Sequence, residues 1–213
     1  MDAANGAHVV ALARDVASLA ARSETMRAQR RQILALAGDV RDAASIDAAV
    51  EQAFLHAKRL DIVVNNAGIA LTRPAALTSD AQWNDVVDTN LTGAFRVARA
   101  AAAAMERAGN GGSIVNIASV LALRVAKQLP AYIAAKAGLL KLTEALAVEW
   151  ASQRIRVNAL APGYVETDLN REFLHSPAGE AIARRVPMRR FGEAADLDGA
   201  LLLLASDAGR YIT

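Results

Sequence analysis

Three side chains in the second half of the sequence could carry out proton transfer. Tyr132 lies thirteen residues after Ser119 and opens the run Tyr-Ile-Ala-Ala-Lys, which ends at Lys136. Side chains four residues apart share one face of a helix. On that face the lysine ammonium can stabilise a phenolate, because tyrosine's ordinary pKa of about 10 is too high for a base at neutral pH. A serine at the end of a preceding strand could hold a substrate oxygen beside the phenol. The pattern therefore predicts a site that makes or breaks a carbonyl.

The composition is that of one globular domain. The chain has 213 residues, no shift in composition along its length, and 54% hydrophobic residues, which excludes a disordered protein. Its 24 basic and 22 acidic side chains leave a formal charge of only +2. We interpret the densest basic cluster as a solvated helix face, since nucleic-acid binding needs a broader stripe. This cluster consists of Arg22, Arg27, Arg30 and Arg31. We expect a single domain over residues 1–213 and no nucleic-acid partner.

The sequence gives no sign of a metal site or a membrane segment. It contains no cysteine, which excludes disulfides and thiolate metal ligands. The three histidines, His8, His56 and His175, are scattered and lack the spacing of metal ligands. No apolar run approaches the ~20 residues of a membrane span, and the N-terminus has no secretory pattern. We expect no bound metal, no membrane association and a cytoplasmic location.

Strand and helix signals alternate along the chain. Continuous apolar strands alternating with helices predict a parallel sheet covered on both faces, a Rossmann-like doubly wound α/β fold. In such sheets ligands bind outside the carboxyl ends of the strands. The candidates Asp39, Asn66, Gly68, Ser119 and Pro162 all follow predicted strands. We expect strands at 8–13, 33–37, 61–64, 113–118 and 156–160, and helices at 16–30, 45–57, 78–105 (one helix or a pair), 132–151 and 196–205.

Over essentially its whole length the sequence resembles the short-chain dehydrogenases/reductases. The resemblance rests on several signatures in the family's order, and it is closest to 3-oxoacyl-carrier-protein reductases and sugar-alcohol or gluconate dehydrogenases. Fold alone does not fix the substrate within such a family. The signatures are Asn65-Asn66-Ala67-Gly68, Asn90 within Asp88-Thr89-Asn90-Leu91-Thr92-Gly93, Ser119, Tyr132 with Lys136, and Pro162-Gly163-Tyr164-Val165-Glu166-Thr167.

The resemblance implies a reaction and a role for each of four residues. Tyr132 would act as general acid in reduction and general base in oxidation, and Lys136 would lower the Tyr132 pKa and hold the nicotinamide ribose. Ser119 would bind the substrate oxygen, while Asn90 would position a water that passes protons towards Lys136. The cofactor would supply the hydride. The implied activity is the NAD(P)-dependent interconversion of a carbonyl and a secondary alcohol on a small-molecule substrate.

The resemblance also marks a set of cofactor contacts. Arg14 follows the tip of the first visible strand and suits the 2′-phosphate of NADP, although Asp15 keeps NAD open. Asp39 is either an adenine contact or a solvated loop carboxylate. Thr167 is either a cofactor ligand or a helix cap, and Asn90 could instead cap or kink its helix. The full set is Arg14, Asp39, Val40, Asn66, Ala67, Gly68, Tyr132, Lys136, Pro162, Gly163, Val165 and Thr167.

One family signature is not found. A dinucleotide-binding sheet opens with a strand, a glycine-rich turn and a helix whose N-terminus faces the pyrophosphate. In this family the turn reads Thr-Gly-x-x-x-Gly-x-Gly, and nothing like it precedes His8. We expect the sheet to lack this first strand and its loop, and also the last strand. The strands at 8–13 and 61–64 should then have unpaired edges or be forced to pair anew. If the chain begins at Met1, NADP binding should be weak or absent.

Three further expectations concern the rest of the chain. Gly109-Asn110-Gly111-Gly112 precedes a strand instead of opening a helix, so we interpret it as a turn and not a phosphate loop. Arg184, Arg185, Arg189 and Arg190 form either a docking patch for an acidic carrier or a solvated flap over the substrate. Family members often assemble through their long helices, here 78–105 and 132–151, which predicts a dimer or tetramer. The alternative functions are an inactive oligomer partner and, less favoured, a binder of another ligand.

Overall fold

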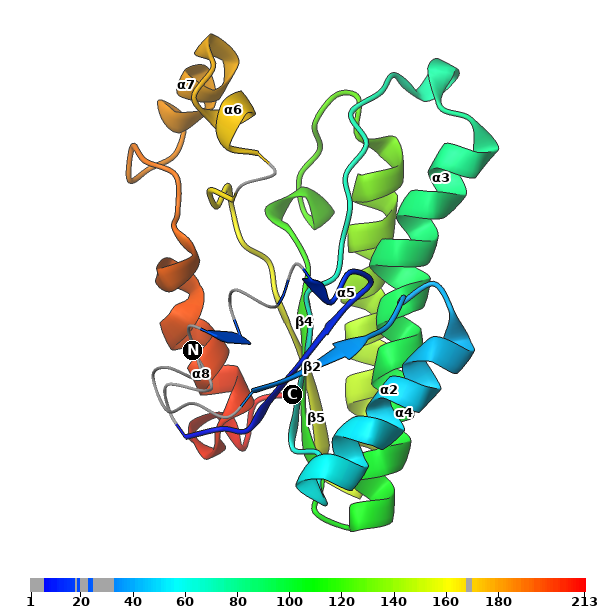
Figure 1. The fold of residues 1–213 in the computed structure, drawn as a ribbon. Coiled ribbons are helices and arrows are strands. Elements are labelled where there is room, and N and C mark those ends of the chain that lie inside the picture. The colour runs from blue at the N-terminus through cyan, green and yellow to red at the C-terminus, as the bar shows by residue number, and fades with distance from the viewer. Residues whose placement is uncertain (1–5, 18, 20–22, 25–32, 168–169) are drawn as a thin grey trace.

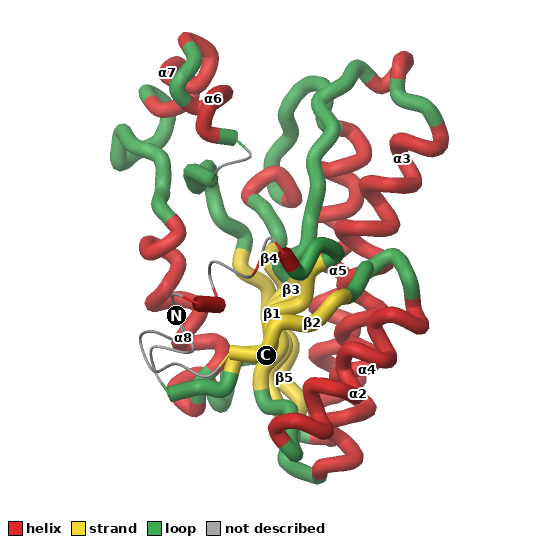
Figure 2. Tube along the Cα trace, viewed as in Figure 1, coloured by secondary structure: helices red, strands yellow, loops and turns green. Residues whose placement is uncertain are grey.

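Two parallel sheets lie at the centre of the structure (Figures 1 and 2). The computed structural model describes residues 6–17, 19, 23–24, 33–167 and 170–213. The predicted helix at 16–30 and its arginine cluster fall largely outside these residues. One sheet has the order β1-β2 and the other the order β3-β4-β5. The strands are β1 (Val9–Ala13), β2 (Ile33–Ala37), β3 (Ile62–Asn65), β4 (Gly112–Ile117) and β5 (Ile155–Leu160).

Helices cover both faces of the strands (Figure 1). Helices α2, α4 and α5 lie on one face, and α8 packs on the other face against β4 and β5. Two short helices, α6 and α7, form a lobe that lies apart from the sheets, in the segment between β5 and α8. In the described part of the chain no helix combines the length and apolar character needed to cross a bilayer. The helices are α2 (Ala43–Ala57), α3 (Asp80–Val87), α4 (Gly93–Ala108), α5 (Pro130–Trp150), α6 (Arg171–Leu174), α7 (Pro177–Ala183) and α8 (Asp198–Ala205).

Shorter helical turns join these elements. Five of those described are 3-10 turns, which suit tight connections of three or four residues. They are η2 (Ala75–Leu77), η4 (Val120–Ala122), η5 (Ala151–Gln153), η6 (Ala194–Leu197) and η7 (Asp207–Gly209).

Local sequence signals explain where several helices begin and end. The Asp42 side chain accepts a hydrogen bond from the Ala44 amide at 2.9 Å, so Asp42 and not Ser45 caps α2. A reciprocal capping box between Ser79 and Gln82 starts α3. Helix α4 ends at Gly109, whose φ of 67° is the left-handed conformation that glycine adopts without strain. The glycine run from that residue is therefore a turn into β4, as predicted.

The region 78–105 is a pair of helices joined by a π-helical turn. Helix α3 runs into η3 (Asp88–Thr92), and the Gly93 amide donates to the Asp88 carbonyl five residues earlier. Helix α4 then continues in the same direction. A π turn inserts an extra residue into a helix and changes the direction of its side chains, frequently at functional sites. The residue at the centre of this turn is Asn90, one of the predicted site residues.

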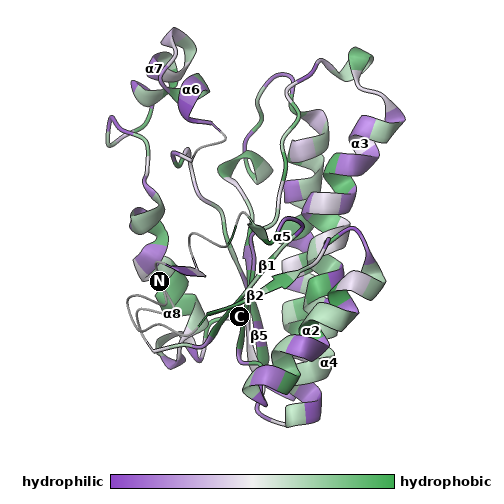
Figure 3. Ribbon diagram, in the orientation of Figure 1, coloured by the Kyte–Doolittle hydropathy of each residue, from purple (hydrophilic) through white to green (hydrophobic). Residues whose placement is uncertain are grey.

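The core lies between the three-stranded sheet and helices α4 and α5. Ile114 on β4 and Val157 on β5 are almost fully buried, as are Met105 on α4 and Leu146 on α5. Alanines on the inner face of α4 let its backbone approach the neighbouring helices closely. Figure 3 shows hydrophobic residues along the strands and mixed colouring on the outer helices. Burial on this side of the molecule therefore follows the predicted parallel-sheet pattern.

A buried chain of polar side chains crosses the three-stranded sheet. Asn65 donates from Nδ2 to the Ala94 carbonyl at 3.1 Å and to Asn116 Oδ1 at 2.8 Å. Asn116 in turn donates from Nδ2 to Thr143 Oγ1 at 2.8 Å, and Thr143 donates to the Leu139 carbonyl at 2.7 Å. The chain links α4, β3, β4 and α5. It gives a physical basis to the sheet-stabilising role that the motif beginning at Asn65 implies.

Within the described residues, β1 and β3 each have one edge that pairs with no other strand. In the described residues β1 pairs only with β2, β3 pairs only with β4, and β1 and β3 do not pair with each other. No strand follows β5 in the described part of the chain. Instead Asn158 Nδ2 donates to the Ile212 carbonyl at 2.9 Å, and the Val157 amide donates to Thr213 Oγ1 at 3.0 Å. The last residues therefore lie along the outer edge of β5.

Candidate active site

Ser119 lies at the carboxyl end of β4. Its backbone is extended, and its Oγ accepts a hydrogen bond from the Leu121 amide at 3.1 Å, which caps the short turn η4. The side chain is largely buried. The next residue, Val120, donates its amide to the Pro162 carbonyl at 2.8 Å. This bond holds the segment after β4 against the segment after β5, so two predicted site regions are adjacent.

Tyr132 and Lys136 occupy one face of the first turns of α5, as their spacing predicts. Lys136 Nζ lies 5.9 Å from the centre of the Tyr132 ring. Pro130 occupies the first turn of the helix, where its missing N–H leaves no intrahelical bond unmade. Tyr132 is half-buried, so part of the residue is accessible to a ligand. The two side chains therefore share one helix face, and their role in proton transfer stays a prediction.

Lys136 is a buried cation at the base of the site. Only 4% of its surface is exposed, and its Nζ donates to the Ile117 carbonyl at 2.6 Å. Burial disfavours the charged form and lowers the pKa of Lys136 to about 8. The side chain therefore stays protonated at neutral pH, but in a poorly solvated environment. A positive charge in such a place stabilises nearby negative charge more strongly than one in water.

Asn90 acts as a clamp on the loop after β3. It is fully buried; its Oδ1 accepts from the Ile69 amide at 2.8 Å and its Nδ2 donates to the Ile69 carbonyl at 2.7 Å. The side chain thus satisfies both backbone groups of one residue. Asn90 is not the N-cap of a helix; it lies inside the π turn. Its contribution to a water relay stays a prediction.

Gly68, in the loop after β3, lies close to both Asn90 and Lys136. A Cβ built on Gly68 would lie 3.0 Å from Asn90 Oδ1 and 3.7 Å from Lys136 Nζ. The backbone therefore passes so close to both side chains that glycine fits best. The neighbouring candidates Asn66 and Ala67 are exposed at the carboxyl end of β3, where a ligand could reach them.

The carboxyl end of β2 carries a fixed carboxylate. Asp39 follows Gly38, and its carboxylate accepts from Arg41 Nε and Nη2, the latter at 2.8 Å. These hydrogen bonds lower the pKa of Asp39 to about 2. Arg41 Nη1 also binds Asp85 Oδ1 at 2.6 Å, which ties the loop to α3. Sequence reasoning missed Arg41, although its position two residues after Asp39 was a signal for such a pair.

Two more predicted contacts lie near this end of the strands. Arg14 follows β1 and is exposed, and its charge contributes to the lowered pKa of Asp39. Asp15 Oδ1 accepts from the Ala17 amide at 2.9 Å, so it begins the next turn. Val40 packs against Gly93, where an added Cβ would lie 2.8 Å from the valine side chain. The Arg14 charge thus acts on Asp39, and Val40 packs against the first residue of α4.

Backbone hydrogen bonds join the segment after β5 to Gly192. Val165 forms a parallel bridge with Gly192, whose amide donates to the Tyr164 carbonyl at 2.8 Å and whose carbonyl accepts from the Glu166 amide at 2.8 Å. Gly163 has open space where a side chain would lie. The α6–α7 lobe is the chain between these bridged residues. Pro162, Gly163 and Val165 therefore lie between β5 and this lobe.

Thr167 does not cap α6. The N-cap of that helix is Asn170, and the Thr167 amide donates to Asn170 Oδ1 at 2.8 Å. The helix-cap interpretation is wrong for α6, because the helix begins three residues later than that interpretation requires. The cofactor-contact hypothesis for Thr167 stays a prediction.

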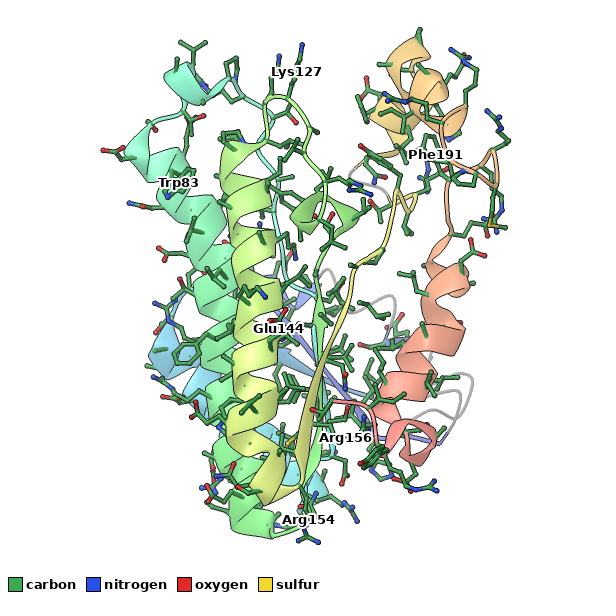
Figure 4. The ribbon with its side chains drawn as sticks, turned by 180° about the vertical axis from the view of Figure 1, so that it is seen from behind. Trp83, Lys127, Glu144, Arg154, Arg156 and Phe191 are labelled. Atoms are coloured by element: carbon green, nitrogen blue, oxygen red, sulfur yellow. The ribbon has the colours of Figure 1, made fainter. Side chains whose placement is uncertain are left out.

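The arginine-rich stretch is partly engaged in contacts within the chain. Arg190 makes a two-point ion pair with Asp196, with N–O distances of 2.6 and 2.9 Å. Arg189 donates to the Arg184 carbonyl, and Arg184 lies 3.9 Å from Glu180. Figure 4 shows Phe191 near the α6–α7 lobe and Lys127 in the loop before α5. These contacts favour a structural flap over a free basic docking patch.

A family model covers nearly the whole chain. The model described as enoyl-(acyl carrier protein) reductase matches residues 2–213. Among curated proteins, the chain is 37% identical over 190 residues to 2-dehydro-3-deoxy-D-gluconate 5-dehydrogenase of Escherichia coli (strain K12), covering 89% of this chain and 75% of that protein. It is 36% identical over 211 residues to the 3-oxoacyl-[acyl-carrier-protein] reductase of the same organism, covering 99% and 84%.

The fold is also that of a solved dehydrogenase. The structure of a gluconate 5-dehydrogenase from Burkholderia cenocepacia J2315 in complex with NADP and tartrate matches with a TM-score of 0.93 and 32% identity. The match covers 99% of this chain and 83% of that chain. The two sheets and the helices that cover them are thus arranged as in a protein that binds NADP.

Proposed function

The chain belongs to the short-chain dehydrogenase/reductase family of oxidoreductases, and we propose that it interconverts a carbonyl and a secondary alcohol at the site of Ser119, Tyr132 and Lys136. The observation that carries this assignment is the buried Lys136 ammonium, 5.9 Å from the Tyr132 ring on the same face of α5. The alternatives of an inactive oligomer partner or a binder of another ligand are not favoured, since the relatives are dehydrogenases and reductases.

Each of the three residues has a distinct task in the proposed reaction. Tyr132 gives a proton to the carbonyl oxygen in reduction and takes it back in oxidation. The Lys136 ammonium stabilises the phenolate that results, because an opposite charge favours the ionised form. Ser119 Oγ accepts from the Leu121 amide, which leaves its hydroxyl proton free to bind the substrate oxygen. Asn90 holds the loop that carries Gly68 through its two bonds to Ile69. In the proposed reaction it would also position a water that passes protons towards Lys136.

Family members use a nicotinamide cofactor, and the residues at the carboxyl ends of the strands fit one. The fit rests on Gly68, whose missing side chain leaves backbone accessible beside Lys136, and on Asp39, a fixed acceptor near Arg14. When bound, the cofactor supplies or accepts the hydride. We propose NADP as the preferred form, because the Arg14 guanidinium suits a 2′-phosphate.

We propose that the described residues bind the cofactor only weakly by themselves. No glycine-rich turn that opens a helix is present in the described ranges, so they offer no cluster of amides to a pyrophosphate. Isothermal titration with NADPH tests this point. We expect a dissociation constant above the micromolar range, and a low-micromolar value would contradict it.

The substrate and the assembly are proposed by analogy with the relatives. Sugar acids and their keto forms are the first class to test, because two of the relatives carry gluconate in their names. A homo-oligomer is supported by exposed apolar residues on the outer helices, Phe95 on α4 and Val148 on α5. Light scattering after size exclusion tests the assembly, and a clean monomer would count against it.

A turnover assay with millimolar cofactor tests the proposed function as a whole. A panel of hydroxy acids, sugar alcohols and their ketones would be followed by absorbance at the nicotinamide band, with NADPH and NADH in parallel. We expect slow turnover that prefers NADPH, and an Arg14→Asp variant that prefers NADH. If wild type and Tyr132→Phe turn over every substrate equally, the Tyr132 assignment is wrong.

A further inference from the structure

Arg41 is the centre of a network of polar contacts at the carboxyl end of β2. Its guanidinium binds the Asp39 carboxylate through Nε and Nη2, and its Nη1 binds Asp85 Oδ1 on α3 at 2.6 Å. The carbonyl of Arg41 accepts from Arg96 Nη1 on α4 at 2.8 Å. The Asp39 amide donates to Ser45 Oγ on α2 at 3.1 Å. Three helices thus hold the short segment that follows β2.

The contacts from Arg41 use most of the acceptor capacity of Asp39. An ionised carboxylate has about four lone-pair sites, two on each oxygen. The guanidinium occupies one site on each oxygen, through Nη2 on Oδ2 at 2.8 Å and an Nε shared between both oxygens at 3.2 Å. The Arg41 amide occupies the second site on Oδ1 at 2.9 Å. Arg41 therefore leaves Asp39 a single acceptor site, on Oδ2, whose direction the ion pair fixes.

The remaining acceptor site is open to a ligand and stays charged. The Asp39 side chain is 29% exposed, and among the described residues every hydrogen-bond donor to its carboxylate belongs to Arg41. The hydrogen bonds from Arg41 lower the pKa of Asp39 to about 2, so the group is ionised at any physiological pH. A carboxylate accepts hydrogen bonds and cannot donate them. The open site therefore selects a ligand that presents an N–H or O–H group there.

The geometry of this network suits positioning better than stabilisation. Exposed ion pairs contribute little to stability, because water and salt screen them. Arg41 differs from an isolated partner, since its guanidinium bridges two carboxylates while Arg96 holds its backbone separately. A planar guanidinium that binds a carboxylate at two points fixes the orientation of that group as well as its charge. Removing the Arg41 side chain should therefore leave the fold intact and allow the Asp39 carboxylate to turn.

We propose that Arg41 is a positioning residue for cofactor recognition, which aims the open oxygen of Asp39 at the exocyclic amino group of the adenine. This inference rests on the proposed function, in which the site takes a nicotinamide cofactor. The 6-amino group of adenine is a hydrogen-bond donor, whereas hypoxanthine carries a carbonyl oxygen at the same position. A carboxylate oxygen that faces this carbonyl gains no hydrogen bond and meets a like partial charge. Asp39 therefore discriminates between two cofactors that differ only in this group.

Deamino-NADPH, which carries hypoxanthine in place of adenine, tests the proposal against NADPH. Protein NMR titration measures both dissociation constants, because it tolerates millimolar ligand and needs no turnover. We expect wild type to bind NADPH at least about tenfold more tightly than deamino-NADPH, and Arg41→Met to bind the two equally. Arg59→Met is the matched control, since Arg59 makes the same kind of two-point pair with Asp61, two residues further along the chain. This control should discriminate as wild type does.

A second measurement reports on Asp39 without any cofactor. Carboxyl-carbon NMR should give an Asp39 pKa of about 2 in wild type and in Arg59→Met, and a pKa that rises towards the ordinary value of 3.8 in Arg41→Met.

The outcomes separate this inference from the proposed reaction. Equal discrimination by wild type and Arg41→Met, or an Asp39 pKa that Arg41→Met leaves unchanged, would overturn the role of Arg41. A wild type that binds both cofactors equally would also overturn it, even if the protein reduces carbonyls with either one. Discrimination without turnover would remove the proposed reaction and support the role of Arg41. A wild type that binds neither cofactor would overturn both proposals.

Discussion

Lys136 Nζ donates a 2.6 Å hydrogen bond to the carbonyl oxygen of Ile117, which ties α5 to the last residue of β4. The bond fixes the ammonium beside the Tyr132 ring without a carboxylate that would neutralise its charge in the same contact. It also satisfies a carbonyl at the end of the strand. The position of the cation is therefore set by the sheet, and the position of the phenol by the helix.

Burial of Lys136 predicts how stability depends on pH. Its pKa is lowered to about 8 from an ordinary value of 10.5, so between these pH values the unfolded chain binds a proton that the folded chain does not. The free energy of unfolding should therefore rise as the pH increases from 8 to 10.5, by roughly 3 kcal/mol at most. Urea unfolding measures this rise. It should vanish in Lys136→Met and persist in Lys141→Met, whose lysine is exposed on the same helix.

Replacing the proton donor should remove activity and leave the fold intact. Tyr132→Phe lacks the hydroxyl, and general acid–base catalysis contributes about 100-fold to 10,000-fold. We expect kcat to fall by at least about 100-fold, with circular dichroism unchanged. Tyr211→Phe is the control, because Tyr211 is fully exposed and far from the site in sequence. A Tyr132→Phe protein with wild-type kcat would exclude this residue as the acid.

The close approach at Gly68 predicts a strong effect of a single methyl group. A Cβ there would lie 3.0 Å from Asn90 Oδ1, so the carboxamide must move and its bonds to Ile69 must lengthen. We expect Gly68→Ala to lower kcat/KM by about tenfold through misplacement of the loop. Gly199→Ala, in α8, has open space and should leave kcat/KM unchanged. Equal activity of the two variants would mean that the loop tolerates displacement.

Two similar ion pairs, one after a strand and one before a strand, test the cofactor contact. Asp39 with Arg41 lies at the carboxyl end of β2, and Asp61 with Arg59 lies at the amino end of β3. We expect Asp39→Ala to weaken NADPH binding by about tenfold, because a charge-assisted acceptor is lost. Asp61→Ala should bind NADPH as wild type does. Calorimetric titration measures both, and a reversed order would place the adenine elsewhere.

The buried polar chain predicts a loss of stability without a loss of chemistry. Asn116→Ala removes one partner each from Asn65 and Thr143. Unsatisfied buried groups of this kind should lower the free energy of unfolding by about 2 kcal/mol. Gln52→Ala, on the exposed side of α2, is the control and should change it by less than about 0.5 kcal/mol. Urea unfolding of both variants measures the difference.

The strands and the shared helix face of Tyr132 and Lys136 could be predicted because their signals are local. The apolar run at β2 was predicted to the residue, and the Tyr132–Lys136 spacing places both side chains on one helix face. Other features depend on contacts between distant segments. Asn90 clamps Ile69 across 21 residues, and Arg41 reaches Asp85 across 44. No periodicity in the sequence signals such pairs, and none signals the π turn that aims Asn90.

The space between β1 and β3 could be predicted only in part from the sequence. Unpaired edges at β1 and β3 were expected from the family pattern, but pattern alone gives neither the shape of the space nor its lining. The strand residues alone do not reveal that α2 contributes alanines to this lining. That detail follows from the packing of α2 on α4, which only the three-dimensional arrangement shows.

The π turn makes α3 and α4 one continuous rod, and this rod touches two regions that are otherwise separate. One of its residues, Val97, lines the space between β1 and β3. Another part, Asn90, holds the loop beside the reactive lysine. The rod therefore links the space between β1 and β3 with the loop that lies beside Lys136. A shift of this rod would therefore move Val97 and the Asn90 carboxamide together.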